Sequence, residues 1–236
     1  MKKKFYYIVL TVLVISIFYN FIFYLSDRIN KVKSEKILKI LENTNNQILS
    51  LSNGLELLKD KYNNNDIVGY LEIENEDFLE PLLQTNDNSY YLNHLINKSN
   101  SELGSTFIDS SVNELSKQIS IYSHSSTIYD LPFNILNKYL DQEYFNNHKI
   151  LKLNYLNKIE LYEVFSVYIT ASLNHLNLEP VNWDEHVKNM IESSIYKSDI
   201  DIKNIDKMIV LQTCYNGNSD GIYLIICGRK IGWRKL

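Results

Sequence analysis

Two residues of this chain have the types and settings that acyl-transfer chemistry requires. Cys214 ends the apolar run at residues 208–214 (MIVLQTC), and His124 ends the run at residues 119–124 (ISIYSH); a polar loop follows each of them. A thiol at the end of a rigid strand can attack a carbonyl, and a neighbouring imidazole can take and return the proton. The alternative is a cysteine that fills a small apolar space in the core, together with a structural histidine.

Other chemical groups narrow the possible functions. His148 and His175 lie in asparagine-rich segments and His186 on the polar side of a predicted helix, so all three are expected at the surface. The sequence has no Cys-x-x-Cys or His-Glu-x-x-His motif, no acidic calcium loop and no glycine-rich phosphate loop. We therefore expect no cofactor and no bound metal. A net charge of −4 gives no reason to expect a nucleic-acid partner.

The second cysteine, Cys227, raises the question of a disulfide. If residues 215–220 close a hairpin, Cys214 lies opposite about Gly221 and roughly 20 Å from Cys227, at ~3.3 Å per strand residue. That separation is too large for a disulfide. We predict that Cys227 is a buried free thiol and that Cys214 is a free reactive one.

The N-terminal segment predicts a membrane anchor. Three lysines, residues 2–4, precede about 21 residues without a charge, and the next charged residue is Asp27. This length suffices for a helix that spans the hydrocarbon core. The sequence shows no small-residue cleavage site before Ser26, as a signal peptide would require. The lysines favour a cytoplasmic N-terminus and an extracellular remainder, although Lys31, Lys33, Lys36 and Lys39 reduce the asymmetry.

Residues 26–65 have the pattern of a helical stalk. Apolar residues recur at helical spacing along one stripe, namely Ile37, Leu41, Ile48, Leu51, Leu55 and Leu58. Gly54 weakens the middle, so one helix and two helices with a break near residues 52–54 both fit. The asparagine run at residues 63–65 marks the boundary to a domain at residues 66–236.

That domain has the pattern of a mainly β structure with helical inserts. Short β-type runs without βαβ spacing predict seven or eight strands, mainly antiparallel and closed into a barrel. The runs are residues 68–73, 106–108, 118–122, 149–153, 158–170, 208–213 and 221–227. Residues 133–144 and 182–196 are predicted helical inserts, and Asn182 is the expected N-cap of the second.

Several short motifs, in the same order along the chain, resemble those of class B sortases, which are membrane-anchored cysteine transpeptidases of Gram-positive bacteria. Residues 209–214 (IVLQTC) are similar to the family's apolar strand that ends in Thr-Cys. Residues 121–124 (IYSH) are similar to its Tyr-Gly-His, with Ser123 in place of glycine. Residues 66–73, 90–94 (YYLNH) and 104–109 (GSTFID) resemble three further signatures, and the long helix before the cysteine strand resembles the class B insert.

The resemblance implies a function and a role for each matched residue. Cys214 would attack the threonine carbonyl of an Asn-Pro-x-Thr-Asn sorting signal on a surface protein and hold the cleaved protein as a thioester. His124 would protonate the leaving amine and then deprotonate an incoming amine from a peptidoglycan precursor or cross-bridge. Asn93 and Thr213 match supporting positions. The fold implied is a sortase-type closed barrel, preceded by N-terminal helices.

The sequence departs from the family at one position. The family places an arginine on the strand after the cysteine, and the matching position holds Tyr223. An arginine would donate to a developing oxyanion with a fixed charge, whereas Tyr223 offers one neutral hydroxyl. Tyr223 is the expected third group, and Arg229, with Arg234 beyond it, is the fallback.

Two alternatives to the transpeptidase remain open. One is a degenerate sortase-like binding module with little or no activity, which the missing arginine motivates. The other is a cysteine peptidase that hydrolyses its target.

Overall fold

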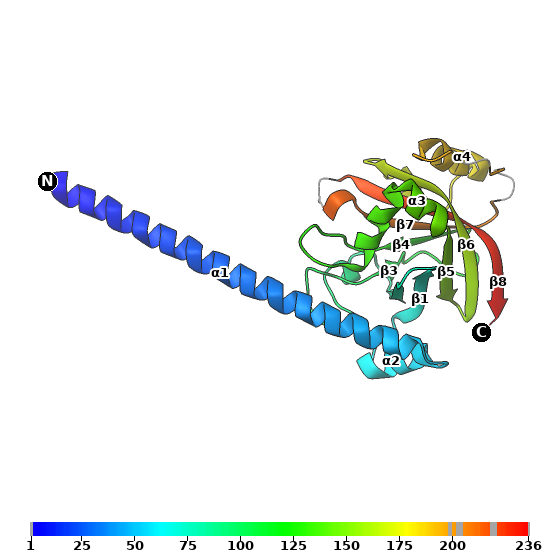
Figure 1. Cartoon of the computed structure of the whole chain (residues 1–236), viewed down its shortest axis with the longest axis horizontal. Helices are drawn as coiled ribbons and strands as arrows, with labels where there is room; N and C mark the ends of the chain where they lie inside the picture. The colour runs from blue at the N-terminus through cyan, green and yellow to red at the C-terminus, as the bar shows by residue number, and fades with distance from the viewer. Residues whose placement is uncertain (1, 198–199, 202–204, 218–220, 236) are drawn as a thin grey trace. The chain divides into compact units, whose positions relative to one another are not determined.

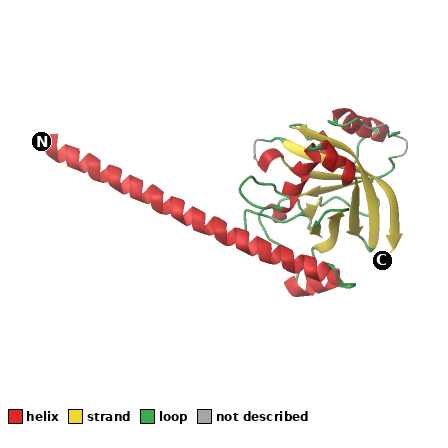
Figure 2. Ribbon diagram, viewed as in Figure 1, coloured by secondary structure: helices red, strands yellow, loops and turns green. Residues whose placement is uncertain are grey.

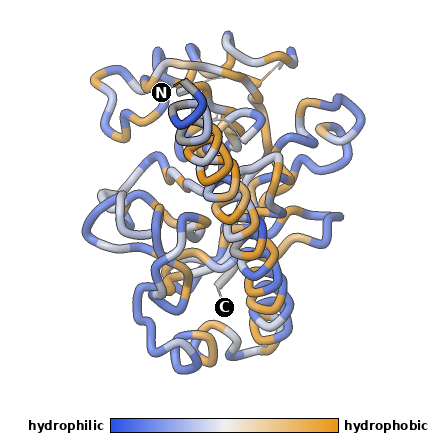
Figure 3. The backbone as a smooth tube through the Cα atoms, turned by 90° about the vertical axis from the view of Figure 1, so that its left-hand side faces the viewer, coloured by the Kyte–Doolittle hydropathy of each residue, from blue (hydrophilic) through white to orange (hydrophobic). Residues whose placement is uncertain are grey.

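A computed structural model of the chain describes residues 2–197, 200–201, 205–217 and 221–235. It divides into two compact units, residues 1–44 and 45–236. Helix α1 (Lys2–Leu49) makes up the first unit as far as residue 44, and its last turn, residues 45–49, belongs to the second unit. Hydrophobic residues run along much of α1 (Figure 3). Among the described residues, one helical segment, Leu10–Leu49 within α1, is long and apolar enough to cross a membrane.

The second unit is a closed eight-stranded barrel with the strand order β1-β2-β3-β4-β7-β8-β6-β5 (Figure 1). Its strands are β1 (Ile67–Ile73), β2 (Leu79–Leu83), β3 (Phe107–Ile108), β4 (Gln118–Tyr122), β5 (Ile150–Tyr155), β6 (Lys158–Thr170), β7 (Met208–Cys214) and β8 (Tyr223–Lys235). The predicted barrel is confirmed. The β-type runs omitted β2, which contains Pro81, a residue that lowers strand propensity.

Parallel pairing at two points makes the sheet mixed. β2 pairs in parallel with β3, and β4 pairs in parallel with β7, while every other neighbouring pair of described strands is antiparallel. Parallel neighbours need a long crossover connection. Between β4 and β7 the crossover includes the hairpin of β5 and β6 together with the helical inserts. The ends of β4 and β7 that come last in the chain therefore lie at the same rim of the barrel.

Alternating side chains separate an inner from an outer apolar layer. Ile119 and Ile121 of β4, with Ile209 and Leu211 of β7, belong to the core that fills the barrel. Val210, which lies between Ile209 and Leu211 on β7, packs in a second cluster with side chains of α4 (Trp183–Ser193). Because side chains on a strand alternate between faces, Gln212 and Cys214 share the outer face with Val210.

Helical segments connect the strands (Figure 2). In chain order after α1 they are α2 (Gly54–Tyr62), the 3-10 helices η1 (Tyr90–Leu92) and η2 (Pro132–Leu140), α3 (Gln142–Asn147), η3 (Asn174–Leu176), α4 and η5 (Tyr215–Gly217). The predicted insert at residues 133–144 is thus a 3-10 helix followed by a short α-helix. The predicted cap of the second insert is confirmed, since Asn182 Oδ1 accepts from the Glu185 amide at 3.2 Å.

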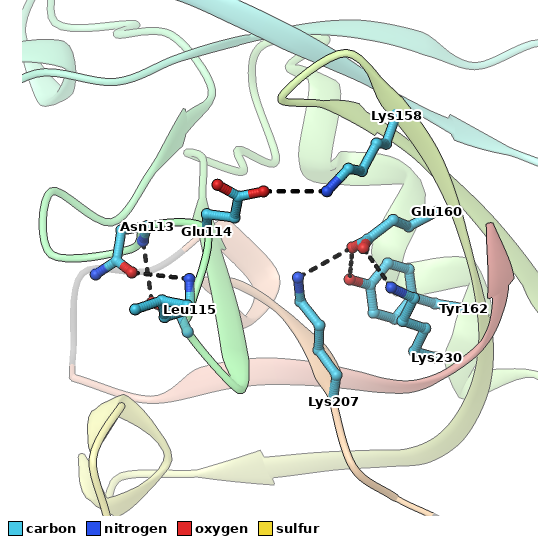
Figure 4. Close-up of polar contacts among 9 residues, drawn as sticks. Asn113, Glu114, Leu115, Lys158, Glu160, Tyr162, Lys207 and Lys230 are labelled. Carbon is cyan, nitrogen blue, oxygen red and sulfur yellow. Dashed lines mark hydrogen bonds and ion pairs between the residues drawn. The ribbon is translucent and has the colours of Figure 1, made fainter. Parts of the chain in front are cut away.

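A charged cluster lies at the barrel end opposite the last residue of β7. Lys207 and Lys230 both pair with the carboxylate of Glu160, and the Tyr162 hydroxyl donates to the same carboxylate at 2.6 Å (Figure 4). Glu160 is buried. Burial opposes its ionisation, but the hydrogen bonds from Lys230 and Tyr162 and the charges of both lysines outweigh burial and lower its pKa. The cluster holds the starts of β6 and β7 against β8.

Candidate active site

The parallel pairing of β4 with β7 brings His124 and Cys214 together. The register runs from Gln118 opposite Met208 to Tyr122 opposite Gln212. Two residues further along each strand, the same register sets His124 beside Cys214. Neighbours in register point to the same face of a sheet, and that face is the outer one. The two residues singled out by their chemistry therefore lie at the same rim of the barrel, His124 two residues beyond the end of β4 and Cys214 at the end of β7.

Hydrogen bonds continue the pairing beyond the last ladder residues. The Ser123 amide donates to the Gln212 carbonyl at 3.3 Å, and Thr213 Oγ1 donates to the Ser123 carbonyl at 2.9 Å. Ser125 Oγ donates to the Cys214 carbonyl at 2.5 Å. Thr213 is 2% exposed, so its hydroxyl serves this contact and does not face substrate. These bonds hold the two strand ends in register where the chemistry would occur.

Cys214 is half-buried and carries a free thiol. Burial raises its pKa above the ordinary value, so the sulfur is a thiol at neutral pH and needs a base before it can attack. Cys227 is also free and fully buried, with its Sγ 3.7 Å from Met190 Sδ. It lies opposite Val210, four residues from Cys214 along β7, or about 13 Å at strand rise. The prediction of two free thiols is confirmed.

His124 has a defined hydrogen-bonding partner. Its Nε2 lies 2.9 Å from the carbonyl oxygen of Leu92. A carbonyl can only accept, so Nε2 carries the proton, and Nδ1 of the neutral ring is then an acceptor. No described residue makes a hydrogen bond to Nδ1. In that neutral form, Nδ1 could take a proton from a thiol.

Asn93 directly follows the residue that binds His124. It caps η1 at its C-terminal end, where its amide donates to the Tyr90 carbonyl at 3.2 Å. Its side chain is exposed. Asn93 thus lies at the edge of the site, one residue from the anchor of the imidazole.

The two candidates for the third group have different positions. Tyr223 begins β8 directly opposite Cys214. Arg229 lies opposite Met208, six residues further along β8, and donates to Glu163 Oε2 from Nε at 3.0 Å and from Nη2 at 2.7 Å. The side chain of Arg234 is outside the described part of the chain. Of the described groups, Tyr223 is the one beside the cysteine.

Comparison with known proteins supports the resemblance that the motifs carry. No family model matches the chain. Sortase B of Listeria monocytogenes is 31% identical over 159 residues, covering 64% of this chain and 63% of the relative. Sortase B of Staphylococcus aureus is 28% identical over 178 residues, covering 71% of each. A Bacillus anthracis protein similar to sortase B superposes with a TM-score of 0.71 at 22% identity, covering 85% of this chain and 98% of that structure.

The chain is similar in sequence to class B sortases and shares their fold. The closed barrel with N-terminal helices and an inserted helix is the fold of this family. The matched region spans about two thirds of the Listeria and Staphylococcus sortases.

All three histidines expected at the surface, His148, His175 and His186, are buried or partly buried, which corrects that prediction. His175 is 3% exposed, and its Nε2 bonds Gln212 Oε1. His186 Nε2 bonds Gln118 Oε1 at 2.9 Å. Burial lowers the pKa of the His175 and His186 rings, so both are neutral at pH 7. Leu178, three residues after His175, packs against the barrel core and was a sequence signal that this segment is not fully exposed.

His175 is the residue near the site that sequence reasoning missed. Its ring centroid lies 6.3 Å from that of Tyr223, and its partner Gln212 is two residues before Cys214 on the same face. The Gln118 side chain also donates to the His175 carbonyl at 2.7 Å. The segment before α4 is therefore held over the outer face of β4 and β7, next to the cysteine.

The loops that follow His124 and Cys214 are in contact. At Gly217, φ is +65°, and a Cβ would lie 2.6 Å from the Cα of Ser126 and 2.7 Å from the Thr127 amide nitrogen. Only glycine fits this conformation and this space. The predicted turn after Cys214 continues into residues 218–220, which lie outside the described residues.

Proposed function

We propose that this chain is a class B sortase, a cysteine transpeptidase that cleaves a sorting signal of the Asn-Pro-x-Thr-Asn type and joins the protein to a cell-wall amine. The observation that supports the proposal is the parallel register of β4 and β7, which, continued by two residues, places the half-buried His124 and Cys214 at the same rim of the barrel. A thiol with a raised pKa next to a histidine with a proton-free nitrogen is the arrangement that nucleophilic catalysis by cysteine needs.

In the first half-reaction His124 Nδ1 takes the thiol proton as the Cys214 sulfur attacks the threonine carbonyl of the signal. The tetrahedral intermediate collapses as the C–N bond breaks. His124 returns the proton to the departing amine, and the surface protein stays on the sulfur as a thioester. Since the thiol is neutral before attack, base catalysis by His124 is required in this step.

In the second half-reaction the amine of a peptidoglycan precursor or cross-bridge enters. His124 takes a proton from it as its nitrogen attacks the thioester carbonyl. The C–S bond breaks and the sulfur recovers its proton from His124. Atoms balance over the cycle, because one amide is exchanged for another and the enzyme returns to its starting state.

The oxyanion of both intermediates needs a donor. Tyr223 is opposite Cys214, so its hydroxyl is the donor assigned here in place of the family's arginine. A neutral hydroxyl gives less stabilisation than a guanidinium, because it has one donor and no charge. Asn93 is a candidate for binding the signal peptide at the edge of the site.

We place the enzyme on the outer side of a membrane. The apolar part of α1 would cross the bilayer, and the lysines at residues 2–4 favour a cytoplasmic N-terminus. The barrel would then meet surface proteins as they leave the membrane.

The test uses the full chain in detergent with a quenched Asn-Pro-Gln-Thr-Asn peptide. Cleavage should be lost in Cys214→Ala and in His124→Ala and retained in Cys227→Ala. Triglycine added as the amine should yield the amide product faster than the acid, which separates a transpeptidase from a hydrolase. Cleavage that persists without Cys214 would refute the proposal.

A second function is favoured by one observation, the absence of an arginine beside Cys214 among the described residues. A degenerate sortase-like module would keep the groove and bind the signal with little or no turnover. A substrate-mimicking vinyl sulfone distinguishes the two, because it alkylates a thiol activated by His124. Tight peptide binding with no alkylation and no cleavage would favour the binding module.

A further inference from the structure

A hydrogen bond to the Leu92 backbone carbonyl orients the imidazole of His124, so the residues that fix Leu92 also fix the orientation of the proposed base. We propose that Gly104 and Tyr91 are positioning residues that fix His124 with its proton on Nε2. The catalytic importance of this placement depends on the proposed function. The placement itself is a property of the free protein and can be measured without substrate.

Gly104 lies where three groups of the site converge. Its φ is +61°, in the left-handed region that favours glycine. A Cβ at this position would lie 2.7 Å from the Tyr91 carbonyl oxygen, 2.9 Å from the Leu92 carbonyl oxygen and 2.9 Å from His124 Cδ2. Two of these contacts are the hydrogen-bonded partners themselves. Any side chain at residue 104 would push the imidazole away from its acceptor.

The chain around Gly104 is pinned to the turn that carries Leu92. The amide of Ser105 donates to the Tyr91 carbonyl at 2.9 Å, and the Gly104 amide donates to the Ser101 carbonyl at 3.1 Å. Gly104 therefore cannot move away from the imidazole without breaking the hydrogen bond between the Ser105 amide and the Tyr91 carbonyl of η1. A substitution must move either the turn or the imidazole.

Tyr91 anchors the same turn from its other side. It is 1% exposed, and its hydroxyl accepts from Asn64 Nδ2 and donates to Asp66 Oδ2, both at 2.9 Å. Asn64 is fully buried and also donates to the Ile96 carbonyl at 2.7 Å. The turn bearing Leu92 is thus fixed to the residues that lead into β1. The Leu92 carbonyl is held in place from both sides.

The first readout is the Nε2–H proton of His124, observed by NMR on uniformly 15N-labelled full-length protein in detergent. A ring N–H that donates to a protein carbonyl exchanges slowly with water, so wild type should show the signal, with His124→Gln to assign it. In Gly104→Ala the signal should broaden beyond detection. In Tyr91→Phe it should weaken.

The second readout is the kinetics of peptide cleavage. Gly104→Ala should lower kcat on the order of a hundredfold with KM little changed, because a displacement of about 1 Å at a catalytic group has an effect of that size. Tyr91→Phe should lower kcat by a smaller factor, roughly tenfold. Gly221→Ala is the matched control, since Gly221 has φ +73° but no atom of the described residues within 4 Å of its Cβ position. It introduces the same backbone strain without contacting His124.

The outcomes are separable. Loss of the Nε2–H signal in Gly104→Ala but not in Gly221→Ala supports the positioning role, even if no peptide is cleaved and the proposed function fails. An Nε2–H signal that is unchanged in both Gly104→Ala and Tyr91→Phe overturns it. If Gly104→Ala does not fold, the Nε2–H signal and the cleavage kinetics of Tyr91→Phe test the positioning role instead.

Discussion

Tyr223 lies directly opposite Cys214 in the antiparallel pairing of β7 with β8. The hydroxyl proposed to replace the family's arginine is thus on the strand that flanks the proposed nucleophile. Its other neighbour is the buried ring of His175, which is neutral at pH 7 because burial lowers its pKa. Any stabilisation of an oxyanion from this side comes from a neutral donor.

Removing that hydroxyl tests its contribution. Tyr223→Phe should lower kcat/KM for the sorting peptide on the order of a hundredfold, the usual effect of losing one oxyanion donor. Tyr223→Arg should recover activity relative to Tyr223→Phe. Tyr70→Phe, on β1, is the control and should retain wild-type rates. Equal rates for Tyr223→Phe and wild type would assign the oxyanion to another group.

The reactivity of Cys214 should depend on pH in a way that reflects its burial. Because burial raises the pKa of the thiol, alkylation by iodoacetamide should keep accelerating above pH 9, the ordinary value. Below that pH the thiol is protonated and reacts slowly. Stopped-flow alkylation followed by mass spectrometry measures this.

Cys227 provides the internal control for that experiment. It is fully buried, and burial raises its pKa further still. The native protein should therefore take up one equivalent of reagent, and Cys214→Ala should take up none. Labelling of Cys227 without denaturant would contradict the buried position.

Thr213 should matter for stability and rate together. Thr213→Val removes the hydroxyl that donates to the Ser123 carbonyl and leaves that oxygen without this partner, at a cost of about 1–2 kcal/mol. The link between the strand ends that carry His124 and Cys214 is then weaker, so kcat should fall as well. Urea denaturation and peptide cleavage measure the two effects. Thr127→Val, at an exposed threonine, should change neither.

The Glu160 cluster should stabilise the barrel only above acidic pH. The pKa of Glu160 is lowered in the folded protein, so its contribution is present above the unfolded value, about 4.5, and is lost as pH falls through the folded value. Glu160→Gln should therefore reduce the free energy of unfolding by about 2 kcal/mol at pH 7 and by less below pH 4.

Glu114→Gln is the matched control for Glu160→Gln. Glu114 also pairs with a lysine, Lys158 (Figure 4), but the Glu114 side chain is 70% exposed. An exposed pair contributes well under about 1 kcal/mol, so this variant should unfold as wild type does. A loss of stability from Glu160→Gln that stays constant from pH 7 to pH 3 would contradict the lowered pKa.

The candidate catalytic residues could be predicted from the sequence, but the residues that lie beside them in the fold could not. Cys214 and His124 each end an apolar run, and local pattern is enough to see this. That β4 pairs with β7 in parallel is a tertiary property, which no alternation of residues reveals. The roles of Leu92 and Gly104 depend on a carbonyl and an empty Cβ position, and neither has a side-chain signature. His175 lies in a polar segment whose burial is decided by the barrel beneath it.

The parallel register of β4 and β7 also determines when in folding the site can exist. Ser123 and Thr213, which join the two strand ends, are 90 residues apart in the chain. Their contact has a high sequence separation, and such contacts form late because loop-closure entropy opposes them. Neither the β5–β6 hairpin nor any other local unit contains both His124 and Cys214. In a nascent or half-folded chain Cys214 and His124 are thus apart, and the proposed nucleophile meets its proposed base only when β7 docks onto β4.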